Sequence, residues 1–323
     1  MSGWRDRARR ILIFTGEHRR SLRRRMAGRG NRLVLVLHRV LPGERGNDHS
    51  PPGMVVSTES FERLLDFLGN EFELPGVTQF LDGHPAPREK PSALVTFDDG
   101  WLDSAENGGA ALHRRGIPGV LFASVDHVER GELFWPERLL ILLPAVDSGE
   151  FRRVTGEGRP DPADAGGVEA LLTRWKGRSR EEREEWIRRL SPGAGGAPEE
   201  RRIATWEELR VLRSRGIEIG SHGMSHRLLT RLPGEEALAE LRLSRERIGE
   251  ALGETPRLFA YPNGDRNEAV RAAAREAGYD FAFSLRGDPR DPYDLPRVNL
   301  HEGKMAEGGG WSPDRLVLAL AAG

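Results

Sequence analysis

Short apolar runs alternate along this chain with segments whose apolar residues recur at helical spacing. A continuous apolar run is typical of a buried strand, and amphipathic spacing is typical of a helix packed on a sheet. The predicted strands occupy 33–37, 93–97, 119–123, 217–220, 257–260, 280–284 and 297–300. The predicted helices are one capped by Ser57 or Thr58, 105–114, one capped by Thr205, 233–252 and 267–277. Strands that alternate with helices form parallel β/α units, so the pattern predicts an α/β fold.

The stretch from 130 to 204 interrupts this alternation. Trp135-Pro136-Glu137 opens an apolar helix through Leu143, and 181–189 has the charge pattern of an exposed helix. Between and after these helices, the Gly, Pro and Asp of 156–167 predict a loop, and the Ser, Pro, Gly and Ala of 191–198 predict a flexible connection. We therefore expect a helical insertion at about 130–204, packed on the outer wall of the main domain.

Composition narrows the class of protein. A chain of 323 residues can bury a full core. The sequence has no cysteine, which excludes disulfides and thiolate metal sites, and its formal net charge of −1 argues against a nucleic-acid binder. We expect one large domain over 33–304, with 305–323 as a C-terminal tail or helix.

The first 32 residues differ in charge from the rest. They contain eleven arginines, opposed only by Asp6 and Glu17. Such a run is typical of a solvated tail, and the alternative is peripheral docking to an anionic membrane face. The apolar run Ile11-Leu12-Ile13-Phe14 is too short for a signal peptide or a membrane span. The sequence therefore predicts a cytoplasmic location, with membrane association through 1–32 as the alternative.

Two carboxylates follow the strand predicted at 93–97. Asp98 and Asp99 precede Gly100, at the carboxyl end of that strand, where α/β folds bind ligands. Side chains of consecutive strand residues point to opposite faces. The two aspartates therefore cannot have the same role, and one could bind a metal while the other accepts a proton. The alternative is an ordinary turn that closes the strand.

Two histidines follow the strand predicted at 217–220. His222 and His226 can converge on one point, either on a helix face or in a tight loop. Imidazole suits zinc, iron, cobalt or nickel. Two imidazoles and one carboxylate would leave positions open for water and substrate, as a catalytic metal site requires. The alternative is a pair of surface or capping histidines.

These two segments resemble motifs of the polysaccharide deacetylases, carbohydrate esterase family four, also called the NodB-homology domain. Thr96-Phe97-Asp98-Asp99-Gly100 is similar to T-F-D-D-G, and 222–226 is similar to H-[ST]-x-x-H, with Gly223 in the Ser/Thr slot. The resemblance implies a distorted (β/α)7 barrel with a helical insertion. It also implies that Asp98 is the catalytic base and that one divalent metal, zinc with cobalt or nickel as alternatives, is bound by Asp99, His222 and His226.

A third segment, 257–264, resembles the family motif R-x-x-R-P-P-Y-G with two departures. Ala260 stands where the family has the arginine that pairs with the catalytic base, so another group must hold Asp98. Asn263 stands where the family has a tyrosine whose backbone N–H holds the oxyanion. A backbone donor survives a change of side chain, so we assign oxyanion and substrate contacts to Tyr261 and Asn263.

The general acid has two candidates. In the family, an apolar strand ending in histidine near the C-terminus supplies this acid. Here Leu33 to Leu37 ends in His38 near the N-terminus, which resembles the circularly permuted members that deacetylate poly-N-acetylglucosamine. His301 ends a second strand-like segment, 297–300. The rigid strand before His38 favours His38 over His301 as the proton donor.

The resemblance implies a hydrolase that removes N-acetyl groups from an N-acetylhexosamine-containing polysaccharide or oligosaccharide and releases acetate. Its partner is an N-acetylated glycan, and the oligomeric state stays open. The alternatives are a metal-dependent amide hydrolase with a non-sugar substrate and a glycan-binding protein that has lost catalysis, which Ala260 favours. On the glycan reading, the insertion has a second possible role, as a cap whose tryptophans stack on sugar rings.

Overall fold

The computed structural model describes residues 32–43, 49–82, 90–191 and 201–322. The basic tail predicted for 1–32 lies outside the described residues except for Arg32, and the connection predicted at 191–198 does so except for Ser191. Within the described residues, no helix has the length and apolar character needed to cross a bilayer.

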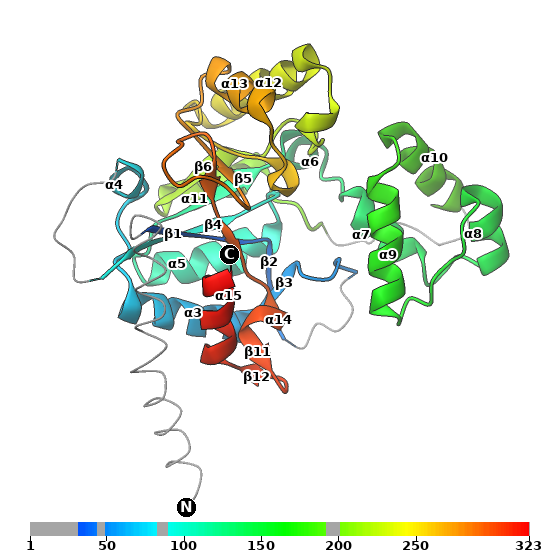
Figure 1. Ribbon diagram of the computed structural model, residues 1–323, viewed down its shortest axis with the longest axis horizontal. Coiled ribbons are helices and arrows are strands. Elements are labelled where there is room, and N and C mark those ends of the chain that lie inside the picture. The colour runs from blue at the N-terminus through cyan, green and yellow to red at the C-terminus, as the bar shows by residue number, and fades with distance from the viewer. Residues whose placement is uncertain (1–31, 44–48, 83–89, 192–200, 323) are drawn as a thin grey trace, which may run out of the picture.

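One parallel sheet forms the centre of the molecule (Figure 1). Its strands pair in the order β10-β1-β4-β5-β6-β7-β8-β9. Their bounds are β1 (Arg32–Leu37), β4 (Ser92–Phe97), β5 (Gly119–Ala123), β6 (Ile217–Ser221), β7 (Leu258–Ala260), β8 (Phe281–Ser284), β9 (Leu295–Pro296) and β10 (Val298–Asn299). The strands predicted from apolar runs are therefore confirmed. The last, predicted at 297–300, is present as β10, and β9 just before it was not predicted; the two form one split strand.

The split strand closes the sheet into a barrel. β9 pairs with β8, whereas β10 pairs with β1 at the other end of the order. Arg297 alone separates β9 from β10 in the chain, so this short segment changes partners at Arg297 and joins the two edges. If β9 and β10 are counted as one strand, the barrel has seven, and the predicted (β/α)7 architecture is confirmed.

The barrel interior is filled by alternate residues of these strands. Val34, Leu94, Val120, Phe283 and Leu295 belong to one buried apolar cluster. The intervening residues, such as Leu35 and Val95 in β1 and β4, pack outward with the helices in a larger cluster. This period of two determines which side chains of each strand continue into the barrel mouth.

Helices surround the barrel, and two of them, α3 and α11, begin at caps that the sequence predicts. Ser57 accepts a hydrogen bond from the N–H of Ser60 at the start of α3, and Thr205 forms a capping box with Glu208 at the start of α11. The surrounding elements are α3 (Thr58–Glu71), α4 (Val77–Leu81), π-helix η2 (Ser104–Gly109), α5 (Ala110–Arg114), α6 (Val125–Arg130), α11 (Trp206–Ser214), 3₁₀ helix η4 (Leu229–Arg231), α12 (Gly234–Leu252), 3₁₀ helix η5 (Pro262–Gly264), α13 (Glu268–Glu276) and the parallel pair β2 (Arg39–Leu41) and β3 (Val55–Ser57).

The insertion is a small helical unit beside the barrel, drawn in green in Figure 1. It contains α7 (Trp135–Leu142), α8 (Ser148–Thr155), α9 (Ala165–Lys176) and α10 (Arg180–Leu190). Its apolar residues form a cluster of their own around the fully buried Trp175, against which Trp135 and Trp186 pack. Sugar stacking by Trp175 is therefore excluded. Two details of the prediction were wrong: neither α8 nor α9 was expected, and the loop predicted to end at 167 ends at the cap of α9, Asp164.

The C-terminal residues belong to the main domain. They form α14 (Glu302–Met305), the hairpin β11 (Ala306–Glu307) and β12 (Gly310–Trp311), and α15 (Pro313–Ala322). Leu316, Val317 and Leu320 of α15 lie buried in the large apolar cluster. Of the two forms predicted for 305–323, the structure shows the helix, and the domain extends past the predicted boundary at 304.

Candidate active site

A cavity of about 940 Å³ opens at the carboxyl ends of the strands, between the barrel and the insertion. The predicted site residues that line it are His38, Asp98, Asp99, His222, His226, Asn263 and His301. They follow four different strands or the turn after β7, as expected for a barrel site built at strand ends. Of the predicted set, only Tyr261 is absent from the lining.

Asp99, His222 and His226 form a compact three-ligand set. One ligand atom from each lies within 4.8 Å of the others. Asp99 Oδ1 is 3.5 Å from Nε2 of His222 and 3.5 Å from Nε2 of His226. Asp99 and His226 have positive φ angles of 77° and 55°. Such backbone strain, on the order of 1–3 kcal/mol per residue, tends to gather at functional sites.

Neighbouring groups fix the orientation of these side chains. The Ala260 carbonyl lies 2.8 Å from His222 Nδ1, and a carbonyl can only accept, so Nδ1 donates and Nε2 is the atom that faces Asp99. Trp101 Nε1–H donates to Asp99 Oδ2 at 2.9 Å, which leaves Oδ1 for a ligand role. Burial lowers the pKa of His226 to about 3, so this imidazole is neutral at pH 7. Two imidazoles and one carboxylate fit a divalent metal.

The loop that carries the two histidines is held from behind. Glu240, on α12, accepts hydrogen bonds from the backbone N–H groups of Met224 and Ser225 and from the Ser225 hydroxyl. Gly223 has a φ of 85°, a conformation that glycine adopts without strain. Phe134, where the insertion begins, packs edge-on against His226 with ring centroids 5.1 Å apart. The loop therefore keeps its shape without a hydroxyl at position 223.

Asp98 is held by an arginine that the sequence analysis did not identify. Arg297 donates two hydrogen bonds to Asp98, at 2.6 Å to Oδ1 and 2.7 Å to Oδ2. Both side chains are buried, and the guanidinium lies 5.3 Å from the ring centre of Phe122. Burial alone would raise the pKa of Asp98, but the charge and hydrogen bonds of Arg297 lower it to about 2. Arg297 thus makes the contact that Ala260 cannot make.

The alternation of the strands explains why the two aspartates differ. Leu94 and Leu295 lie in the interior apolar cluster, and Asp98 and Arg297 follow them by four and two positions. Both side chains therefore continue the interior face. Asp99 leaves that face through its left-handed backbone and meets Trp101 and the histidines instead. The predicted division of labour between Asp98 and Asp99 has a structural basis here.

Replacing Arg297 with Leu should shift the acidic limb of the pH–activity profile to higher pH. Without the guanidinium, burial is the dominant influence on Asp98 and raises its pKa. In the parent, the ionised pair adds stability above the ordinary aspartate pKa of 3.8, and this stability is lost only as the pH falls through about 2. We expect the variant to lose about 3–5 kcal/mol at neutral pH, because a buried charge is left without its partner. Arg297→Lys keeps the charge and should shift the limb less; equal profiles for all three proteins would contradict this role.

The two candidate general acids both reach the cavity. His38 follows β1, and its Nδ1 is buried with no hydrogen-bond partner among the described residues. His301 precedes α14, and its pKa is lowered by burial, by Lys304 and by His38. Both candidates lie in the cavity, so the preference for His38 stays a prediction.

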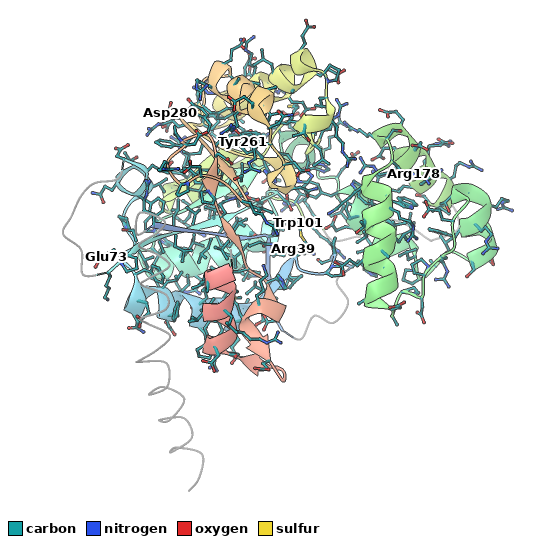
Figure 2. All side chains as sticks on the ribbon, in the orientation of Figure 1. Arg39, Glu73, Trp101, Arg178, Tyr261 and Asp280 are labelled. Atoms are coloured by element: carbon teal, nitrogen blue, oxygen red, sulfur yellow. The ribbon has the colours of Figure 1, made fainter. Side chains whose placement is uncertain are left out.

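Tyr261 belongs to the core and not to the site, which corrects the sequence-based assignment. Its hydroxyl donates to the carbonyl of Tyr293 at 2.9 Å, and its backbone N–H donates to the carbonyl of Phe283 at 3.0 Å. Figure 2 shows Tyr261 beneath α12 and α13, whereas Trp101 lies beside Arg39 at the barrel mouth. Both polar groups of Tyr261 are used internally, so neither can reach a substrate. Asn263, in a left-handed turn with φ 57°, lines the cavity as expected.

Comparisons with known proteins agree with this geometry. A sequence model of the family described as polysaccharide deacetylase matches residues 86–282, more than half of the chain. Chitin deacetylase 1 of Cryptococcus neoformans var. grubii is 43% identical over 63 residues, which make up 20% of this chain and only 13% of that protein.

Solved structures show the same fold over nearly the whole chain. Streptococcus pyogenes deacetylase PplD in complex with acetate aligns with a TM-score of 0.60 and 12% identity, covering 89% of this chain and 97% of that one. IcaB from Ammonifex degensii aligns with a TM-score of 0.56 and 20% identity, covering 90% and 95%. At these identities the likeness is one of fold.

Proposed function

Because the chain belongs to the polysaccharide deacetylase family, we propose that it is a metal-dependent hydrolase that removes N-acetyl groups from an N-acetylhexosamine-containing glycan. The observation that carries this proposal is the separation of Asp98 from Asp99. Asp98 is ion-paired with Arg297, whereas Asp99 faces the imidazoles of His222 and His226. One cavity thus contains a base and a ligand set, which amide hydrolysis requires together.

Asp99, His222 and His226 would hold one divalent metal, for which zinc is our first choice. A cation bound there would polarise the acetamide carbonyl and make an adjacent water more acidic. The orientation of the ligands does not depend on the cation, because the Ala260 carbonyl fixes His222 and the Trp101 indole fixes Asp99. This preorganisation is typical of catalytic metal sites.

Two side chains of the protein would carry out the proton transfers, Asp98 as the base and His38 as the acid. Asp98, kept ionised by Arg297, takes a proton from the attacking water. The oxygen of that water adds to the acetamide carbon, and the backbone N–H of Asn263 faces the developing oxyanion. His38 gives a proton to the leaving nitrogen as the C–N bond breaks. The products are acetate and a hexosamine amine, so the reaction balances with one water consumed.

His38→Ala should lower kcat by about 10²–10⁴-fold, the usual contribution of a general acid. The metal content should be unchanged, because His38 is not one of the three ligands. The basic limb of the pH profile should disappear, because that limb reports loss of the donated proton. His301→Ala is the matched comparison, as both histidines line the same cavity, and it should cost less. The opposite order would assign the acid role to His301.

The structure bears on the two alternative functions. Ala260 favoured a glycan-binding protein without catalysis, since the family arginine is missing there. Arg297 supplies the same contact to Asp98 from another strand, so this reason no longer holds. The remaining alternative is an amide hydrolase for small non-sugar substrates. The cavity, at about 940 Å³, lies at the upper end of the size range of small-molecule pockets, which favours an oligosaccharide.

Acetate release from a panel of N-acyl compounds tests the proposal. We expect acetate from N-acetylglucosamine oligomers in the presence of added metal, and little from small N-acetyl amides. Turnover of the small amides alone would favour the non-sugar hydrolase. Metal binding without acetate from any member of the panel would favour the inactive binding protein.

A further inference from the structure

A group of cations lies on the cavity wall that the insertion provides, outside the catalytic residues. Lys176 ends α9, Arg180 begins α10 and Arg183 lies one turn further along α10. Arg231, at the end of η4, comes from the barrel and donates to the Lys176 carbonyl at 2.6 Å. All four line the cavity. We call Lys176, Arg180, Arg183 and Arg231 the cation cluster.

No member of the cation cluster forms an ion pair in the part of the chain that the structure describes, although other arginines of the same cavity do. Arg138 pairs with Glu184, and Arg227 pairs with Glu236. Two exposed carboxylates, Glu169 and Glu181, share the wall without forming an ion pair with any member of the cluster. Like charges gathered without partners favour the binding of an anion.

Within the described residues, Arg183 also lacks a hydrogen-bond acceptor for one of its donor atoms. Its Nε atom is buried and has no hydrogen-bond partner among the described residues, and its guanidinium lies 4.8 Å from the ring centre of Trp135. Burial lowers its pKa, the charges of Glu184 and Glu181 oppose this effect, and the charges of Arg231 and Arg180 reinforce it. A buried donor without an acceptor is unfavourable, and a guanidinium fork matches the oxygens of phosphate and carboxylate groups.

We propose that the cation cluster binds an oxyanion carried by the glycan, so that the substrate class is an anionic N-acetylated glycan bearing phosphate or carboxylate groups. This inference rests on the proposed function, because it places the anion and the acetamide on one molecule in one cavity. A fully deacetylated hexosamine polymer would carry ammonium groups, which the cluster repels. The cluster therefore favours a glycan that carries its negative charge on sugars other than the one being deacetylated.

Binding to the metal-loaded Asp98→Asn protein tests this proposal without turnover. Calorimetry would compare a neutral N-acetylglucosamine tetramer with the same tetramer carrying a phosphate ester and with a tetramer containing a uronate. We expect at least one anionic ligand to bind about tenfold or more tightly than the neutral one, with a preference that weakens as salt rises. The phosphate and uronate arms identify which oxyanion the cluster recognises.

A matched pair of charge variants locates the effect. Lys176→Gln with Arg180→Gln removes two exposed members of the cation cluster and keeps Arg183 and Arg231, so the preference for the anionic ligand should fall clearly below that of the parent. Arg188→Gln with Arg189→Gln removes the same charge from α10 at positions outside the cavity lining, and the preference should stay. Thermal unfolding of both double variants checks that each is folded.

Equal binding of neutral and anionic tetramers, or no binding of any tetramer, would overturn the inference. An equal loss of the preference for the anionic ligand in both double variants would also overturn it, because that loss would come from the change in net charge and not from the cation cluster. Acetate release from the neutral tetramer reports on the proposed function separately. Acetate release without an anionic preference means that the cation cluster is not a subsite, whereas no acetate from any glycan means that the proposed function has failed.

Discussion

Replacing His226 with Ala should abolish stoichiometric metal binding and reduce acetate release by roughly a thousandfold or more. Among the described residues, Asp99, His222 and His226 form the only group of three or more such ligands, so the substitution leaves two of them. Two remaining ligands hold a divalent ion weakly, and Lewis-acid stabilisation of several kcal/mol corresponds to about three orders of magnitude in rate.

Elemental analysis after dialysis measures the loss directly. His113→Ala is a suitable control, since His113 is another histidine, lies outside the cavity lining and hydrogen-bonds to the Arg215 carbonyl instead. The control should keep one metal per chain. Unchanged metal content in the His226 variant would mean that the ligand set is wrongly assigned.

Asp98→Asn should keep the metal and lose about 10²–10⁴-fold in kcat. The substitution removes the base but preserves size, and Arg297 can still donate to the amide oxygen. Asp99→Asn should lose the metal, because the substitution weakens one of the three ligands. The second oxygen of Asp99 accepts a hydrogen bond from Trp101 and cannot replace the first. Comparing the two isosteric variants separates base from ligand.

Metal content and single-turnover rates would be measured on both aspartate variants. Metal loss from Asp98→Asn together with full metal content in Asp99→Asn would mean that the two roles are exchanged. Full activity of Asp98→Asn would rule out its role as the base.

Local patterns were enough to predict the strands and the two main motifs. The apolar runs before Asp98 and His222 are continuous, so strand ends could be placed, and parallel strands bring such ends to one edge of a barrel. Helix caps could also be predicted, because a cap contacts a residue only three positions away. Thr205 was predicted directly, and Ser57 was one of two candidates for its helix.

Contacts across the closed barrel were not visible in the sequence. Arg297 lies 199 positions from Asp98, and their meeting depends on a strand that changes partners from β8 to β1. Glu240 reaches the histidine loop from α12, 15 positions beyond Ser225. The strand-like segment 297–300 contained an arginine between apolar residues, and that buried charge was the available signal for a partner in the site.

One assignment failed for an identifiable reason. Tyr261 follows a buried strand, and its side chain lies in the apolar cluster with Phe259 and Tyr279, where its hydroxyl donates to a carbonyl. Tertiary burial outweighed the local turn signal of the segment after β7. At the C-terminus the sequence left a tail and a helix open, and the packing of Leu316 and Leu320 into the main core accounts for the helix.

The most direct test is acetate release from an N-acetylglucosamine oligomer by metal-free protein titrated with zinc. We expect negligible release without metal, a linear rise with added zinc, a plateau at one equivalent per chain, and one free amine formed for each acetate. This result would show that one metal ion, assigned here to Asp99, His222 and His226, is required for hydrolysis of the acetamide. Full acetate release without any divalent metal, or one-equivalent zinc binding with no acetate formed, would contradict the proposed deacetylase.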